Sequence, residues 1–299
     1  MSGEAAVGLT WESQRRRGSA FGAVSRFVRK KPLGAVGGFL VTVVVLAALL
    51  APFVSPHDPI TIYRGKQFVP PGSVEFILGT DNVGRDLLSR LIWGSQVSLY
   101  VGIVSVLVGS TLGATLGLTS AYFGGTLDTV IQRVIDSIMA FPALVLAIAI
   151  VAMMGASTNN VVAALSVVLI PQGARVIRAA ALSAKENQYI DAARAIGCSD
   201  IRIISRHLFP QCVAPFIVLA TASVGWAIVV EASLNFLGVG TPPPTPTWGG
   251  MLSGAARRYA ETAPWMAIFP GIAISLAVFG FNMLGDALRD VLDPRLRTG

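Results

Sequence analysis

Charged residues are scarce in this sequence. They make up 13% of the 299 residues, whereas 53% of the residues are hydrophobic. An average soluble protein has about 25% charged residues. So few charges cannot cover a surface that faces water, so much of the surface must face lipid hydrocarbon. The composition excludes an ordinary water-soluble globule and predicts an integral membrane protein.

Cysteine is scarce as well, with only Cys198 and Cys212 in the chain. Neither belongs to a CxxC pair or to a Cys/His spacing typical of zinc sites. This excludes a disulfide-rich scaffold, and we predict no metal site. The sequence also contains no GxxxxGK[S/T] loop, the element that binds nucleotide phosphates in many ATPases. We therefore assign neither a catalytic residue nor a cofactor to this chain.

Long uncharged runs predict an all-α protein with six transmembrane helices, because a helix needs about 20 mostly apolar residues to cross a bilayer. The longest run contains turn-forming residues at 155–160, which divide it into two spans. The runs are Leu33 to Val54, Val97 to Phe123, Ser137 to Ala174 (two spans), His207 to Val230 and Thr262 to Gly285.

Lysine and arginine are distributed unevenly between the two sides of these spans. With the N-terminus in the cytoplasm, the inner segments hold 17 basic residues and the outer segments hold 6. Since basic segments tend to stay in the cytoplasm, both termini are predicted to be cytoplasmic. The first span is then an uncleaved signal anchor.

The same analysis divides the chain into segments. Residues 21–31 alternate basic and apolar side chains, which fits either a short amphipathic helix on the inner leaflet or a disordered basic tail. The predicted segments are a basic N-terminal segment (1–32), a first span (33–54), an outer segment (55–96), a five-helix core (97–286) with a cytoplasmic loop at 181–210, and a tail (287–299).

The outer segment 55–96 is proline-rich at first and then reads LGTDNVGRD at 78–86. Thr80 or Asp81 is expected to cap a helix with Asp81/Arg85 and Asp86/Arg90 pairs. We expect that helix to lie along the outer membrane interface. The later outer sequence TPPPTPTW, at 241–248, cannot be helical and predicts a rigid polyproline-like loop.

Three polar residues near span boundaries are candidates for a gate or for structural contacts: Glu231, Asn235 and Asp136. Asp136 is expected to anchor the inner interface. An ion relay needs several ionisable groups in series within the bilayer, and the predicted spans lack them. A secondary transporter is therefore a weaker alternative, because the sequence has neither such groups nor an internal repeat. An intramembrane enzyme is weaker too, because no catalytic constellation lies in the spans.

Small residues and prolines also mark the spans. Gly109, Gly113 and Gly117 follow one another at four-residue spacing, which predicts close packing against another helix. Pro142 and Pro171 are expected to kink or loosen their helices.

The cytoplasmic stretch 185–210 reads KENQYIDAARAIGCSDIRIISRHLFP. Ile190, Ala193 and Ile196 or Gly197 lie at helical spacing. Gly197 is expected to end this helix, and Ser199 or Asp200 to begin a second one. A link between adjacent spans needs only a few residues. We therefore predict a helix-turn-helix whose small residues let another protein approach closely.

Asp191-Ala192-Ala193, followed by Gly197 and Pro210, resembles the EAA loop of binding-protein-dependent ABC importers. Together with three further stretches, it makes the sequence similar to the "C" permease of dipeptide/oligopeptide importers. Asp191 stands where that family usually has Glu, and His207 and Phe209 stand where it has Ile and Leu. The further stretches are 79–86, 231–240 and 282–295.

This resemblance implies the architecture of a type I ABC importer permease in the bacterial plasma (inner) membrane. Such a subunit is non-catalytic and forms half of a path for di- and oligopeptides, although nickel, glutathione or another small solute remains an alternative. The implied ATPase-coupling residues are Asp191, Ala192, Ala193, Gly197 and Pro210. The implied partners are a second permease subunit in a heterodimer, two ATPase subunits or domains that bind ATP and Mg, an extracytoplasmic substrate-binding protein and membrane lipid, but no nucleic acid.

Overall fold

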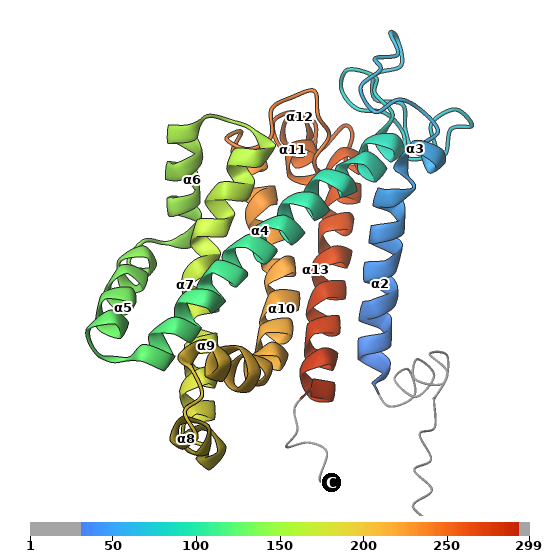
Figure 1. Cartoon of the computed structure of the whole chain (residues 1–299). Coiled ribbons are helices and arrows are strands. Elements are labelled where there is room, and N and C mark those ends of the chain that lie inside the picture. Colours follow the sequence, from blue (N-terminus) through green and yellow to red (C-terminus); the bar gives the residue numbers. More distant parts are fainter. Residues whose placement is uncertain (1–30, 293–299) are drawn as a thin grey trace, which may run out of the picture.

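The computed structural model describes residues 31–292, which form helices and loops (Figure 1). Within that range the single isolated β-bridge joins Thr80 to Asp86. The N-terminal residues 1–30, with both interpretations of the basic segment, and residues 293–299 of the tail lie outside the described residues. The helices are α2 (Pro32–Leu49), α3 (Ala51–Val54), α4 (Leu87–Phe123), α5 (Gly125–Met139), α6 (Ala143–Met154), α7 (Thr158–Lys185), α8 (Gln188–Ala195), α9 (Asp200–Ile203), a π-helical turn (Ile204–Leu208), α10 (Phe209–Phe236), α11 (Trp248–Leu252), α12 (Ala255–Arg258) and α13 (Trp265–Leu292).

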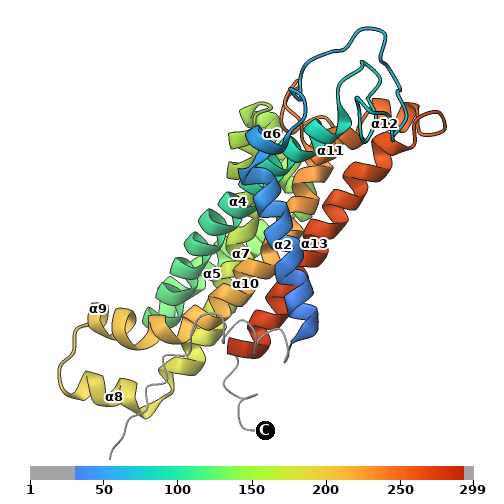
Figure 2. The same ribbon diagram turned by 90° about the vertical axis from the view of Figure 1, so that its right-hand side faces the viewer.

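The long helices α2, α4, α7, α10 and α13 run between two ends of a bundle (Figures 1 and 2). We call the end that carries α3, α11 and α12 the outer end, following the orientation expected from the basic residues. The opposite, inner end carries α8 and α9, which project to one side, away from α2 and α13 (Figure 2).

Five helical stretches are long and apolar enough to cross a membrane, and the pair α5 and α6 is the sixth candidate. This pair is bent by 88° at the break. Pro142, which has extended backbone angles and precedes α6, interrupts the helix. The expected kink at Pro142 is thus a full break, and α6, with 12 residues, rises only about 18 Å at ~1.5 Å per residue.

The second predicted span also differs, because α4 is continuous over 37 residues from Leu87. The separate interfacial helix expected before Val97 is thus wrong, and its residues are the first turns of α4. Asp86, rather than Thr80 or Asp81, caps this helix, and its carboxylate accepts a hydrogen bond from the Ser89 N–H at 2.8 Å.

Of the two ion pairs expected around the start of α4, one forms and the other does not. Arg85 pairs with Asp81 at 2.6 Å, as expected. Arg90 does not pair with Asp86, whose Oδ2 caps α4. Instead the Arg90 Nε lies 3.8 Å from the Asp81 carboxylate.

The boundaries of the last two spans move as well. The helical stretch that contains α10 runs from Asp200 to Phe236, so it is longer at both ends than the run His207 to Val230. The helix α13 continues to Leu292, so it extends into the predicted tail. Uncharged runs mark the hydrocarbon-facing part of a helix, whereas the helix itself extends into charged sequence beyond the membrane.

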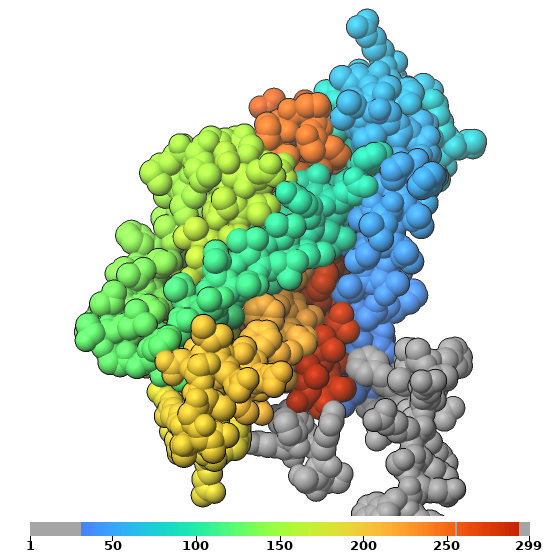
Figure 3. Space-filling view, in the orientation of Figure 1, coloured from blue at the N-terminus to red at the C-terminus, as the bar shows by residue number. Residues whose placement is uncertain are grey.

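The tightest packing joins α4 to α7, where the spaced glycines predicted close contact. A Cβ on Gly113 would lie 2.9 Å from the Ala174 backbone nitrogen and 3.1 Å from the Gly173 Cα. These distances leave no space for a side chain, so the two backbones touch directly. In the space-filling view α4 crosses one face of the molecule diagonally, and the loop with α8 and α9 protrudes below it (Figure 3).

Candidate functional site

The expected helix-turn-helix lies at the inner end, as α8 followed by α9. Ile190 and Ala193 form the buried side of α8. They belong to one apolar cluster with Tyr122 of α4 and with Ala181 and Ala184 of α7. The loop is therefore packed onto the ends of two long helices.

Gly197 forms the turn between the two short helices. Its φ is +81°, and its N–H donates to the Arg194 carbonyl at 2.9 Å. The Cys198 N–H donates to the Ala193 carbonyl at 3.0 Å. Glycine is favoured here for its left-handed conformation, since nothing lies within 4 Å of a Cβ built at this position.

Polar contacts that the sequence analysis missed also hold the loop. The Tyr122 hydroxyl donates to the Asp200 carboxylate at 2.5 Å. The Lys185 ammonium donates to the Tyr122 carbonyl at 2.7 Å, at the end of α4. The Arg194 guanidinium lies over the Tyr122 ring, 5.6 Å from its centroid. Tyr122 and Asp200 are 78 positions apart in the sequence, and no local pattern could have predicted this contact.

The outward side of the loop carries Asp191 and Ala192 together with two apolar side chains. Ile196 is 80% exposed and Ile201 is 79% exposed. Within residues 31–292, the one ion pair of Asp191 is a long one with Arg194, at 3.8 Å. We call Asp191, Ala192, Ile196 and Ile201 the coupling surface, after the role that the resemblance implies for this loop. An exposed apolar surface with a charged member is typical of a site that binds another protein.

Two of the implied coupling residues lie apart from this surface. Ala193 is 5% exposed and faces the apolar cluster. Pro210 lies near the start of α10, after the π-helical turn. Ala193 supports the loop from behind. Ile196, expected at the same helical spacing as Ile190 and Ala193, is exposed instead, because α8 ends at Ala195. No local pattern indicated that Ile201 is exposed.

Asp136 lies on α5 and pairs with Arg175 of α7 at 2.7 Å. Eight residues earlier on α5, the Asp128 carboxylate accepts two hydrogen bonds from the Arg178 guanidinium, at 2.8 and 2.6 Å. These ion pairs tie α5 to α7. Asp136 thus links α5 to α7 through an exposed charge pair, and its role as an anchor at the inner interface stays a prediction.

Glu231 and Asn235 lie one turn apart near the outer end of α10, and both are buried. The Glu231 carboxylate accepts hydrogen bonds from the Ser98 hydroxyl at 3.0 Å and from the Asn235 amide. The Asn235 side-chain oxygen accepts from the Thr241 N–H at 2.6 Å. This chain of contacts joins α10 to α4 and to the proline-rich loop, whereas a gating role for Glu231 stays a prediction.

Comparison with known proteins gives matches over most of the chain. Residues 109–298 match the family described as "Binding-protein-dependent transport system inner membrane component". Residues 21–71 match the "N-terminal TM domain of oligopeptide transport permease C".

Three relatives illustrate the likeness. The chain is 43% identical to a di/tripeptide transport system permease of Pseudomonas aeruginosa, over 88% of this chain and 89% of that protein. It is 40% identical to a dipeptide transport system permease of Haemophilus influenzae, over 91% and 94%. It is 42% identical to a glutathione transport system permease of Pectobacterium atrosepticum, over 91% and 90%.

The fold is similar to that of a chain in an inward-facing structure of the MetNI methionine ABC transporter. The TM-score is 0.57 at 17% identity, and the match covers 68% of this chain and 96% of the other. These matches agree with the membrane-spanning helices and the inner loop that the structure shows. The chain belongs to the family of inner membrane components of binding-protein-dependent transport systems.

Proposed function

We propose that this chain is the permease subunit of an ATP-binding-cassette importer for di- and oligopeptides, and that its coupling surface docks a cytoplasmic ATPase. The observation that carries the proposal is the coupling surface itself, which exposes Ile196 and Ile201 on a loop packed onto α4 and α7. As a multi-pass protein of the bacterial inner membrane, the chain has this loop at the inner end of its helices.

The loop can transmit a movement because it is held at several points. The apolar contacts of Ile190 and the hydrogen bonds of Lys185 and Asp200 join it to the inner ends of α4 and α7. A partner that displaces the loop therefore displaces both helices. Nucleotide-driven closure of the ATPases would then move these helices as rigid levers.

The chain works in this proposal with separate partners. A second permease subunit completes the path, two ATPase subunits bind ATP and Mg, and an extracytoplasmic binding protein delivers the substrate. Catalysis lies entirely in the ATPases. The coupling residues Asp191, Ala192 and Gly197 take part through contact and shape, not through chemistry.

Peptides are the substrate class that the names of two of the three relatives support. Glutathione, which the name of the third relative gives, is itself a small peptide with a modified linkage. Nickel is the alternative of a different chemical class. Among the described residues, no group of three or more His, Cys, Asp or Glu side chains is placed to hold a metal ion.

The test is uptake of labelled trialanine by cells with and without this chain, beside capture of the ATPase on an affinity-tagged copy. We expect uptake to fall on deletion, and Ile196→Asp to lower ATPase capture about tenfold, equivalent to ~1.4 kcal/mol. Ile62→Asp is the matched control, because Ile62 is exposed at the outer end. Nickel uptake that depends on the chain while trialanine uptake does not would reject the peptide assignment. Failure to capture any ATPase would reject the subunit assignment.

A further inference from the structure

A polar pocket of about 400 Å³ lies at the outer end of the molecule. It brings together two stretches that the sequence analysis singled out, 79–86 and 231–240, together with the proline-rich loop and α11. Its lining includes Arg85 and Arg90 from the first stretch and the start of α4, Asn235 from α10, and Thr241 and Thr245 from the proline-rich loop. A volume of this size is typical of small-molecule sites, at about 300–1,000 Å³.

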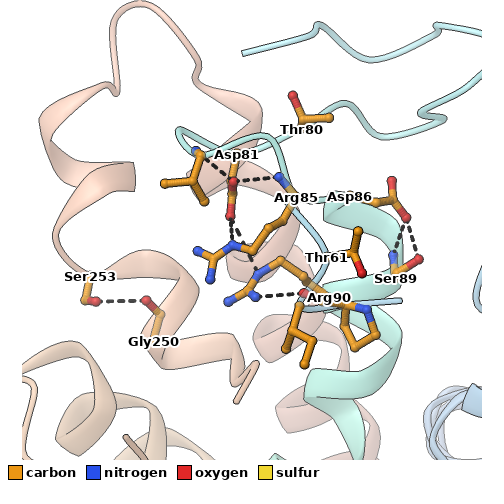
Figure 4. A network of polar contacts seen from close by, with 12 residues as sticks. Thr61, Thr80, Asp81, Arg85, Asp86, Ser89, Arg90, Gly250 and Ser253 are labelled. Carbon is orange, nitrogen blue, oxygen red and sulfur yellow. Dashed lines mark hydrogen bonds and ion pairs between the residues drawn. The ribbon is translucent and has the colours of Figure 1, made fainter. Parts of the chain in front are cut away.

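Arg85 and Arg90 share one carboxylate, that of Asp81 (Figure 4). This carboxylate also accepts the backbone N–H groups of Val83 at 3.0 Å and Arg85 at 2.9 Å. Its Oδ1 therefore accepts two hydrogen bonds, and its Oδ2 accepts one from the Arg85 Nε and lies at ion-pair distance from the Arg90 Nε. Two guanidinium groups facing one carboxylate leave this part of the pocket with a net positive charge.

Both guanidinium groups retain donors for a ligand. Arg85 uses its Nε toward Asp81, and no hydrogen bond within residues 31–292 uses its two terminal nitrogens. Arg90 uses one terminal nitrogen for the Pro59 carbonyl, at 2.9 Å. Figure 4 shows both groups pointing toward the side where Gly250 and Ser253 lie. The Arg90 side chain is 8% exposed, so it is a buried charge that faces the pocket.

The remaining walls suit the rest of a small peptide. Leu87, Met251 and Met266 provide apolar surface, and Pro242, Pro243 and Pro244 form a stiff rim. The hydroxyl groups of Thr241 and Thr245 can bond a peptide backbone. A peptide amino terminus is disfavoured here, because the Asp81 carboxylate already pairs with two guanidinium groups that would repel an ammonium group.

We propose that this pocket is a binding site of the permease for the C-terminal carboxylate of a small peptide, with Arg85 and Arg90 as its ligands. The proposal rests on the proposed function and names a place where the substrate first meets this chain. Arginine suits the task because its planar group can bond both oxygens of a carboxylate at once.

The test measures equilibrium binding of labelled trialanine to the complex captured through a tag on this chain, in nanodiscs and without the binding protein. We expect trialaninamide, which lacks the carboxylate, to bind at least tenfold more weakly than trialanine. Arg85→Gln should lower trialanine affinity at least tenfold, and Arg85→Lys should lower it less. Arg257→Gln is the matched control, since Arg257 is exposed at the outer end and does not line the pocket.

A second variant leaves the ion pair between Arg85 and Asp81 intact. It tests the pocket even if Arg85→Gln is unstable. Thr245→Trp changes an exposed loop residue that lines the pocket and should block it. Equal binding of trialanine and its amide, or full binding by Thr245→Trp, would overturn the proposal. So would displacement of trialanine and its amide alike by inorganic phosphate, which would indicate an anion site without peptide selectivity.

The two proposals fail in different ways. If uptake of trialanine by cells depends on the chain but the complex does not bind trialanine, the pocket proposal is wrong and the importer function stands. If the complex binds trialanine through Arg85 but uptake does not need the chain, the proposed function is wrong and the pocket stands. If Arg85→Gln weakens docking of the binding protein and leaves trialanine binding unchanged, the pocket receives an acidic side chain of that protein, which rejects the peptide assignment.

Discussion

The two ends of the molecule are built from different interactions. At the inner end, apolar side chains such as Ile190 and Ala193 hold the loop from behind, and its outward side exposes Ile196 and Ile201. At the outer end, ion pairs and backbone hydrogen bonds around Asp81 hold the loops, and the polar groups turn inward to a pocket. An exposed apolar surface suits a protein partner, whereas an enclosed polar pocket suits a small ligand.

The two ends also differ in how much stability a single substitution should remove. At the inner end, a single substitution removes only one of many contacts that hold the loop, and each of these contributes little to stability. The outer network depends on Asp81, whose carboxylate meets two guanidinium groups. The predictions below test this difference, from the largest expected effect to the smallest.

The largest expected effect concerns which side of the membrane each end faces, since thiol labelling there should be either present or absent. A membrane-impermeant thiol reagent should label Cys198 in inside-out vesicles and not in spheroplasts, because Cys198 lies in the inner loop. Cys212→Ser removes the second, buried thiol from the signal. Val74→Cys in a chain without native cysteines should give the reverse pattern, since Val74 is fully exposed at the outer end. Labelling of Cys198 in spheroplasts would invert the orientation.

Asp81→Asn should have the largest effect on stability. It leaves the buried Arg90 and the half-buried Arg85 without their carboxylate, at a cost on the order of 3 kcal/mol. We expect the amount of chain in the membrane to fall severalfold, measured by immunoblot. Glu75→Gln is the matched control, because Glu75 pairs with Lys66 where both side chains are 49% exposed. Equal abundance of the two variants would show that the outer network does not depend on Asp81.

Gly197→Ile should affect coupling rather than abundance. A β-branched residue at a φ of +81° strains the turn, at a cost of about 1 to 3 kcal/mol. We expect ATPase capture and trialanine uptake to fall about tenfold or more while the chain remains in the membrane at its normal level. Normal uptake at normal abundance would contradict the assignment of this loop as the coupling element. Gly65→Ile, at a φ of +77° in the outer loop with open space around it, is the matched control for strain alone.

Tyr122→Phe should have the smallest effect. It removes the hydrogen bond to Asp200 and keeps the ring that packs under the loop, so the cost is about 1 kcal/mol. We expect faster hydrogen exchange of the amides in α8 and α9, with abundance unchanged. Exchange as slow as in the unchanged chain would mean that apolar packing alone holds the loop. Tyr100→Phe serves as control, because the Tyr100 hydroxyl bonds to Asn159, outside the loop.

Local patterns in the sequence were sufficient for several features. The spacing of Ile190 and Ala193 and the position of Gly197 predicted the helix-turn-helix, because helical periodicity and a left-handed turn are properties of a few consecutive residues. The spaced glycines of α4 predicted its close packing for the same reason. The family resemblance was read from four stretches and is confirmed by the matches.

Features that depend on distant residues were missed or misplaced. Arg90 was expected to pair with Asp86, four residues away, but Asp86 caps α4 and Arg90 turns to Asp81. The bend between α5 and α6 was expected as a kink within one span, because a proline shows that a helix is interrupted but not by what angle.

The sequence by itself therefore determined that this chain crosses a membrane, which stretches are helical, and to which family it belongs, since scarce charge and local spacing are visible in one dimension. Only the tertiary structure decided that residues 79–86 and 231–240 meet at one pocket, and that Tyr122 fastens the inner loop. The reason is physical. A buried polar group must find a partner wherever the fold brings one, and that partner is commonly far away in the chain.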